Sequence, residues 1–275
     1  MGRYIQLHEG HARIKAMSKH YQLPHSALQT VIGLMLAALI AGTWLSIHFY
    51  GMFVFELTWV SLPIALGLAA VQCWLSVGVF IITHDAMHGS LAPRHPKLNS
   101  TIGATLLVLY AGFNWRFMRD AHFTHHKLSG HAGDPDFDEE HPSNFLAWYW
   151  TFFKRYFGLQ SLLLVHVVVA LYWFAFDVPF LQVFVLYGAP ALLSSLQLFY
   201  FGTYRPHHQA SAKPFADHHN ARSNDFGTLA SLASCFHFGY HLEHHRAPNV
   251  PWWALPGAKK AGVGAVQDKK EATTA

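Results

Sequence analysis

Long stretches without charge alternate with short polar breaks along this chain. Residues 27–50 and 57–83 contain no Asp, Glu, Lys or Arg, and the same holds for residues 159–176 and 178–204. A helix needs about 20 mostly apolar residues to cross a bilayer, so each stretch predicts one membrane-spanning helix. Because the polar break within each pair is short, the four helices should form two hairpins. The pattern therefore indicates an all-α integral membrane protein with four transmembrane helices.

Two shorter apolar segments lie between the second and third predicted spans. Residues 101–113 form a run that is too short to cross comfortably, which leaves a re-entrant, interfacial or buried helix. Residues 144–158 are rich in aromatic side chains and include Lys154 and Arg155, a mixture typical of a helix in the membrane interface. We expect a helical cap at one end of the spans.

The charged residues predict the orientation of the spans. The two hairpin loops carry only Glu56 and Asp177, whereas all 19 Lys and Arg lie in the N-terminal arm, in residues 84–158 and after Tyr204. The positive-inside rule places these three regions, and so both termini, in the cytoplasm, and connectivity through four spans independently puts them on one side. We expect an arm over residues 1–26, one inner-membrane domain over residues 27–256 and a disordered tail over residues 257–275.

Histidine is the unusual feature of the composition, because its 22 copies outnumber the 19 Lys and Arg together. Many of them gather in three boxes, THDAMHG, HFTHH and HLEHH, where spacings of three and four place rings on one helical face. His237 lies four residues before His241, the first histidine of HLEHH, and His219 lies further upstream in DHHNARS. Protonated rings would repel one another, so neutral rings that hold a metal explain the clustering. The box histidines are His84, His88, His122, His125, His126, His241, His244 and His245.

The number of box histidines indicates two metal ions. Eight ligands are too many for one ion, since a zinc site takes about four. Imidazole suits iron, zinc, copper and nickel, so the ligand type alone does not select the metal. All three boxes fall on the predicted cytoplasmic face, where an apolar substrate would arrive from the bilayer. Oxidising an unreactive C–H bond there needs a redox metal, which favours iron over zinc.

Several other classes of function find no support in the sequence. Two cysteines give neither a disulfide framework nor a cysteine-based zinc pattern. The basic residues form no stripe with aromatics, which argues against nucleic acid as a partner. The chain also has no glycine fingerprint for a dinucleotide, no cysteine cluster for iron–sulfur and no CxxCH for haem. Oxygen chemistry would therefore need electrons from a separate protein, and a basic surface would suit an acidic donor.

The boxes HxxxH, HxxHH and HxxHH around two hydrophobic hairpins resemble the integral-membrane di-iron superfamily of fatty-acid desaturases and hydroxylases. The segments THDAMHGSL, GDPDF, DHHNARS, CFHFGYHLEHH and PNVPWWALP are similar to those of the bacterial-type β-carotene 4-ketolases. This resemblance covers residues 84–256, and the span pattern extends it to about residue 27. It implies that the eight box histidines bind two Fe2+ ions and that His219 and His237 join the site. The basic-Pro-Gly-His stretch of the family reads RPHH here, which makes His208 a weaker candidate and leaves the role of His207 in doubt.

The resemblance implies an O2-dependent oxidation of C4 and C4′ of β-ionone rings to ketones in carotenoid biosynthesis. Two hydroxylations at one carbon would give a geminal diol, which loses water. The expected route runs from β-carotene through echinenone to canthaxanthin, with zeaxanthin to astaxanthin as a further conversion. A carotenoid in the bilayer, membrane lipid and a ferredoxin-type electron donor are the implied partners.

Two alternatives remain open at this point. A fatty-acyl desaturase or hydroxylase would use the same scaffold, and its lipid products would identify it. A membrane metal transporter or sensor would need polar groups near the bilayer midplane, whereas the boxes gather at one face. Several acids beside the boxes are candidates to orient the metal ligands, because bound histidines usually donate their second N–H to a carboxylate or carbonyl. These acids are Asp85, Asp120, Asp134, Asp136, Asp217 and Glu243.

Overall fold

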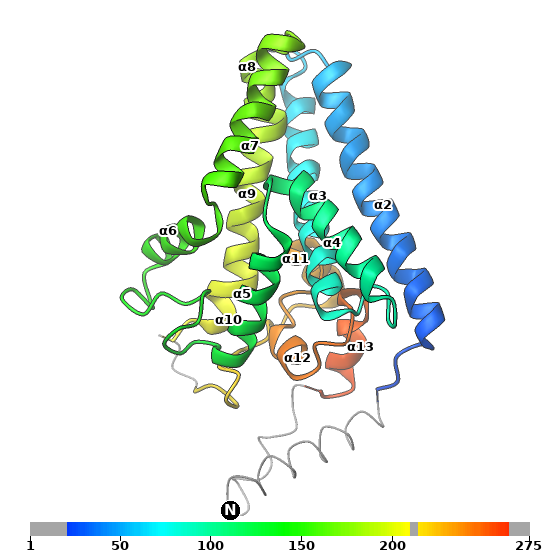
Figure 1. Cartoon of the computed structure of the whole chain (residues 1–275), viewed down its shortest axis with the longest axis vertical. Helices are drawn as coiled ribbons and strands as arrows, with labels where there is room; N and C mark the ends of the chain where they lie inside the picture. The colour runs from blue at the N-terminus through cyan, green and yellow to red at the C-terminus, as the bar shows by residue number, and fades with distance from the viewer. Residues whose placement is uncertain (1–20, 210–213, 264–275) are drawn as a thin grey trace, which may run out of the picture.

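The computed structural model describes residues 21–209 and 214–263, and within these ranges the regular structure is entirely helical (Figure 1). The predicted all-α fold is thereby confirmed. Most of the N-terminal arm (residues 1–20) and the end of the tail (residues 264–275) lie outside the described residues.

Three helices are long and apolar enough to cross a membrane: Ser26–Phe53 (α2), Leu62–His88 (α3) and Phe180–His207. A fourth candidate is bent by 85° between Phe145–Tyr156 (α6) and Leu159–Ala175. The helices converge at the end marked by α8, while the opposite end carries the cap (Figure 1). The chain is therefore an integral membrane protein with three spans, or four when the bent pair counts as one.

The last two spans are segmented by π-helical turns. The third consists of α7 (Leu159–Ala170) followed by a π-helical segment, Leu171–Ala175. The long helix Phe180–His207 alternates between α-helical and π-helical segments. Its segments are α8 (Phe180–Val183), π-helical Phe184–Gly188, α9 (Ala189–Leu198), π-helical Phe199–Tyr204 and α10 (Arg205–His207).

Buried polar side chains connect the spans. Trp44 of α2 donates its indole N–H to Ser76 Oγ of α3 at 2.9 Å. The Gln182 amide donates to the carbonyls of Gly51 and Phe55, both at 2.8 Å. Because the bilayer core offers no water, such groups must find partners inside the protein, and these bonds fix the register of the helices.

The cap is built from short helices and one longer pair. Helix α4 packs along α3, so the segment expected at residues 101–113 is a packed helix. Helix α13 extends into the segment that we expected to be disordered from residue 257, because Leu255 and Ala258 are buried against Tyr240 and Val250. The cap helices are α4 (Pro96–Ala111), α5 (Trp115–Leu128), α11 (Thr228–Cys235), α12 (His241–Arg246), the 3-10 turn Trp252–Ala254 and α13 (Leu255–Lys260).

Candidate metal centre

Nine histidines form two adjoining groups where the spans meet the cap. Within each group the available ring nitrogens all lie within 4.8 Å of one another. The first group, site A below, is His84, His88, His122, His126 and His244. The second group, site B below, is His125, His207, His241 and His245.

Helical periodicity divides each HxxHH box between the two sites. In α5, His122 and His126 are four residues apart and face site A, while His125 faces site B. In α12, His241 and His245 face site B, while His244 faces site A. One helix thus supplies two rings to one site and a single ring to the other, which places the two sites side by side.

The ring nitrogens point at common centres. In site A, Nε2 of His88 lies 2.6 Å from Nε2 of His122, and Nε2 of His126 lies 3.0 Å from Nε2 of His244. In site B, Nε2 of His241 lies 2.9 Å from Nε2 of His207 and 3.0 Å from Nε2 of His245. Such convergence of acceptor-capable nitrogens is the arrangement that a shared cation requires.

The burial of these rings fits metal ligation. Among residues 21–209 and 214–263, neither ring nitrogen of His84 in site A has a hydrogen-bond partner, although the ring is buried. Buried polar atoms are normally paired, so nitrogens left without a protein partner match a site that a metal completes. Burial and neighbouring histidines lower the pKa of His241, His244 and His245 well below its usual value. Neutral imidazole is the form that binds metals, so the donor set suits two imidazole-binding ions.

Asp134 is the acid that orients a ring of site B. Its carboxylate accepts a hydrogen bond from Nδ1 of His125 at 3.0 Å and backbone N–H bonds from Gly130 and Asp136, both at 2.8 Å. Burial lowers the pKa of His125, but the adjacent Asp136 and Asp134 outweigh burial, and the net shift is upward. The bond to Asp134 fixes the tautomer and directs Nε2 of His125 toward site B.

The other acids beside the boxes contact different groups. Asp85 accepts the backbone N–H of Trp252 at 3.0 Å, which ties the C-terminal segment to α3. Asp217 pairs with Arg246 at 2.7 Å, and Glu243 accepts a hydrogen bond from Ser223. Asp120 is exposed on α5. The contacts of Asp85, Asp217 and Glu243 hold the cap segments in place around the two sites.

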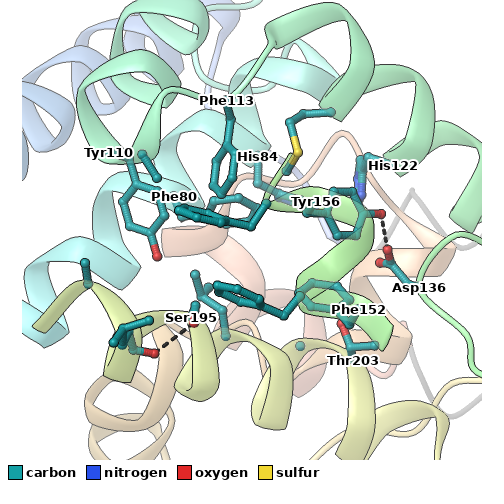
Figure 2. Close-up of a pocket in the computed structure, with 18 of the residues that line it drawn as sticks. Phe80, His84, Tyr110, Phe113, His122, Asp136, Phe152, Tyr156, Ser195 and Thr203 are labelled. Carbon is teal, nitrogen blue, oxygen red and sulfur yellow. Dashed lines mark hydrogen bonds between the residues drawn. The ribbon is translucent and has the colours of Figure 1, made fainter. Parts of the chain in front are cut away.

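An apolar cavity of about 260 Å³ ends at the histidines (Figure 2). It is lined by residues of α3, α4, α5, α6 and the long fourth span, and it reaches His84, His122, His125 and His241. This volume is below the about 300–1,000 Å³ typical of pockets for drug-sized ligands. Its aromatic walls include Phe80, Tyr110, Phe113, Phe152, Tyr156 and Phe238.

Comparison with known proteins agrees with this geometry. The family profile "Fatty acid desaturase" matches residues 57–166 and 151–273. A β-carotene ketolase of Paracoccus sp. (strain PC1) is 42% identical over 240 residues, which cover 87% of this chain and 97% of the relative. A second, from Paracoccus sp. (strain N81106 / MBIC 01143), is 43% identical over 250 residues, covering 90% and 99%. The chain belongs to the β-carotene ketolase family.

More distant relatives of this ketolase-family chain carry different substrate names. A zeaxanthin 4-ketolase of Chlamydomonas reinhardtii is 32% identical over 262 residues, which cover 89% of this chain and 56% of that protein. No solved structure gives a significant match.

The structure of this ketolase-family member brings all eight box histidines together and adds His207, whose role the sequence left in doubt. His219 and His237 lie outside both sites. The His219 ring is 5.7 Å from the His245 ring and is grouped with Asp217 and His218. The His237 ring stacks on Tyr240 and Trp252, with centroids 5.9 Å and 6.1 Å away.

His208 also lies outside the two sites. The place of His207 near the end of a predicted span could have identified His207 as a candidate ligand. The His208 ring packs on Tyr204, with 4.7 Å between ring centroids. His207 ends the fourth span as His88 ends the second, so both lie at the same membrane face.

Proposed function

We propose that this protein is a β-carotene 4-ketolase, which oxidises C4 of a β-ionone ring to a ketone at the expense of O2. One observation carries the proposal: an apolar cavity between membrane helices ends at two adjoining histidine sites. A substrate dissolved in the bilayer can enter such a cavity laterally without passing through water. The β-carotene ketolases of Paracoccus support the carotenoid as the substrate class.

We propose iron as the metal, held by the histidines of site A and of site B. Two iron ions bound there would supply the activation of O2 and the oxidising power for the reaction. The imidazoles of the nine histidines in the two sites would hold these ions. Whether His219 or His237 adds to this set stays a prediction, as does the role of each box histidine.

The residues of the cavity bind and orient the ring. Phe80 and Phe113 from one wall and Phe152 from the other enclose the space in front of His84 and His122 (Figure 2). Flat apolar walls suit a planar conjugated chain and exclude water from the oxidation. Phe238 contacts the rings of His84 and His241, with centroids 4.6 Å and 4.9 Å away, and closes the inner end of the cavity. A ring held there presents C4 to the two sites through two successive hydroxylations.

The electron donor, the orientation in the membrane and the domain boundaries are proposed from the sequence. The electrons come from an external, ferredoxin-type donor, because the sequence contains no redox-cofactor motif. The cap and both termini face the cytoplasm, as the positive-inside rule predicts. We propose residues 27–256 as one membrane oxygenase domain, onto which the rest of α13 (Leu255–Lys260) also packs.

The proposal is tested by pigment analysis in a bacterial host that makes β-carotene. The intact chain is expressed beside a His244→Ala, His245→Ala double variant at matched protein level, and carotenoids are separated by liquid chromatography and identified by mass spectrometry. We expect mono- and diketones with the intact chain and none with the variant, which loses one ligand from each site. Unchanged β-carotene with metal-loaded intact protein would refute the proposal, and altered host fatty acids would point to a fatty-acyl desaturase or hydroxylase.

A further inference from the structure

Two hydroxyls in the cavity wall, those of Thr203 and Tyr187, make no hydrogen bond within the part of the chain that the structure describes, and Thr203 is the nearer of the two to His207 along their shared helix. Thr203 lines the cavity and is only 5% exposed, yet its hydroxyl makes no hydrogen bond to any residue that the structure describes. Its side chain lies at the wall beside Phe152 (Figure 2). The hydroxyl is therefore open to the apolar cavity, and a ligand that fills the cavity and excludes water has to supply its missing bond.

Three other hydroxyls along the cavity, those of Ser195, Tyr110 and Tyr156, are already engaged. Ser195 donates to the carbonyl of Leu192 at 2.8 Å and lies 2.7 Å from the Tyr149 hydroxyl. The Tyr110 hydroxyl lies 2.8 Å from Ser194 Oγ, and the Tyr156 hydroxyl donates to Asp136. Thr203 differs from these groups because its donor and acceptor capacity is fully available.

The position of Thr203 places it at the metal end of the cavity. It lies four residues before His207 of site B on the same continuous helix, so the two side chains share one helical face. It also belongs to the π-helical segment Phe199–Tyr204, which contributes Gly202 and Thr203 to the cavity wall. π-Helical turns inside α-helices occur frequently at functional sites.

We propose that the Thr203 hydroxyl holds the C4 hydroxyl group of the first oxidation product and so retains it for the second oxidation. This inference rests on the proposed function. In each round one O2, two electrons from the external donor and two protons convert a C4–H bond to C4–OH and release one water. The second round gives a geminal diol, which loses water to leave the ketone. An unmodified ring offers Thr203 no polar partner, so the bond exists only after the first round.

Retention by this bond sets the balance between hydroxylated and ketone products. A net hydrogen bond of ordinary strength corresponds to roughly a two- to tenfold preference. Thr203→Val removes the hydroxyl and keeps the shape of the side chain, whereas Thr203→Ser keeps the hydroxyl. We therefore expect Thr203→Val to raise the ratio of 4-hydroxy to 4-keto rings by roughly two- to tenfold while β-carotene consumption changes less. Thr203→Ser should keep the ratio of the unmodified protein.

The experiment measures this ratio by liquid chromatography and mass spectrometry in β-carotene-producing cells. Thr30→Val, the same replacement on α2 away from the cavity, is the matched control and should leave the ratio unchanged. With purified, metal-loaded protein, Thr203→Val should raise KM for the 4-hydroxylated carotenoid more than KM for β-carotene.

Three results would overturn the inference: an unchanged product ratio in Thr203→Val, a proportional loss of both products, or a Thr203→Ser variant as altered as Thr203→Val. Absence of any ketone from the intact chain would instead refute the proposed function, and the role of Thr203 would fall with it.

Discussion

Replacing Asp134 by Asn should weaken metal binding at site B while leaving site A loaded. The carboxylate is 4% exposed and accepts bonds from three donors, Nδ1 of His125 and the backbone N–H groups of Gly130 and Asp136. An amide of the same size offers one acceptor oxygen and an NH2 donor in place of the second oxygen. One of the three buried donors then faces another donor.

The magnitude follows from these contacts. A buried donor left unpaired costs about 1–3 kcal/mol of folding stability. Loss of the group that orients a ligating histidine typically reduces metal affinity about 10–100-fold. His125 is one of four rings in site B and contributes nothing to site A, so the effect should be confined to one of the two ions.

The assay titrates the purified protein with a chelator and measures retained metal per chain by mass spectrometry. Asp138→Asn is the matched control, because Asp138 is equally buried in the same loop but bonds the backbone of Glu140 and His141. We expect Asp134→Asn to lose half of its metal at about 10–100-fold lower free chelator than the control. Equal retention by Asp134→Asn, Asp138→Asn and the unmodified protein would refute the assigned role of Asp134.

Three further substitutions probe the arrangement. His207→Gln should reduce the metal content from two ions to one and abolish ketone formation. His208→Gln should change neither quantity. Elemental analysis measures the metal content of both variants, and pigment analysis measures their ketone formation. Gly202→Ala places a Cβ 2.9 Å from the Phe238 ring, which should displace that ring toward the site and lower ketone formation about 10–100-fold with metal retained. Gly78→Ala places a Cβ 2.5 Å from the Phe236 ring and should cost about 1–3 kcal/mol, measured as a lower thermal unfolding temperature in detergent.

The spans could be predicted from the sequence because the bilayer imposes one simple requirement, a long run without charge. The second helix nevertheless continues past the predicted end at residue 83 to His88, since Asp85 reaches the cap, where it accepts the backbone N–H of Trp252. The box histidines could be predicted because they share helical faces. Their division between site A and site B depends on how α3, α5 and α12 pack together, which local spacing does not contain.

His237 shows where periodicity failed as a guide. Its spacing of four from His241 predicted a shared helical face, but α12 begins only at His241. Phe236 and His237 both have positive φ angles, 46° and 62°, and form the turn between α11 and α12. The turn directs the His237 ring to Tyr240 and Trp252 instead. His207 escaped prediction for the opposite reason, because a single histidine has no periodic partner on its own helix.

The most direct test of the two-site account is the iron content of active protein. The chain is purified from β-carotene-producing cells under conditions that preserve ketone formation, and iron per chain is determined by elemental mass spectrometry. The account predicts two iron ions per chain, one for each histidine group, with activity proportional to occupancy of both. Full ketone-forming activity in protein that holds one iron ion per chain, or none, would contradict it.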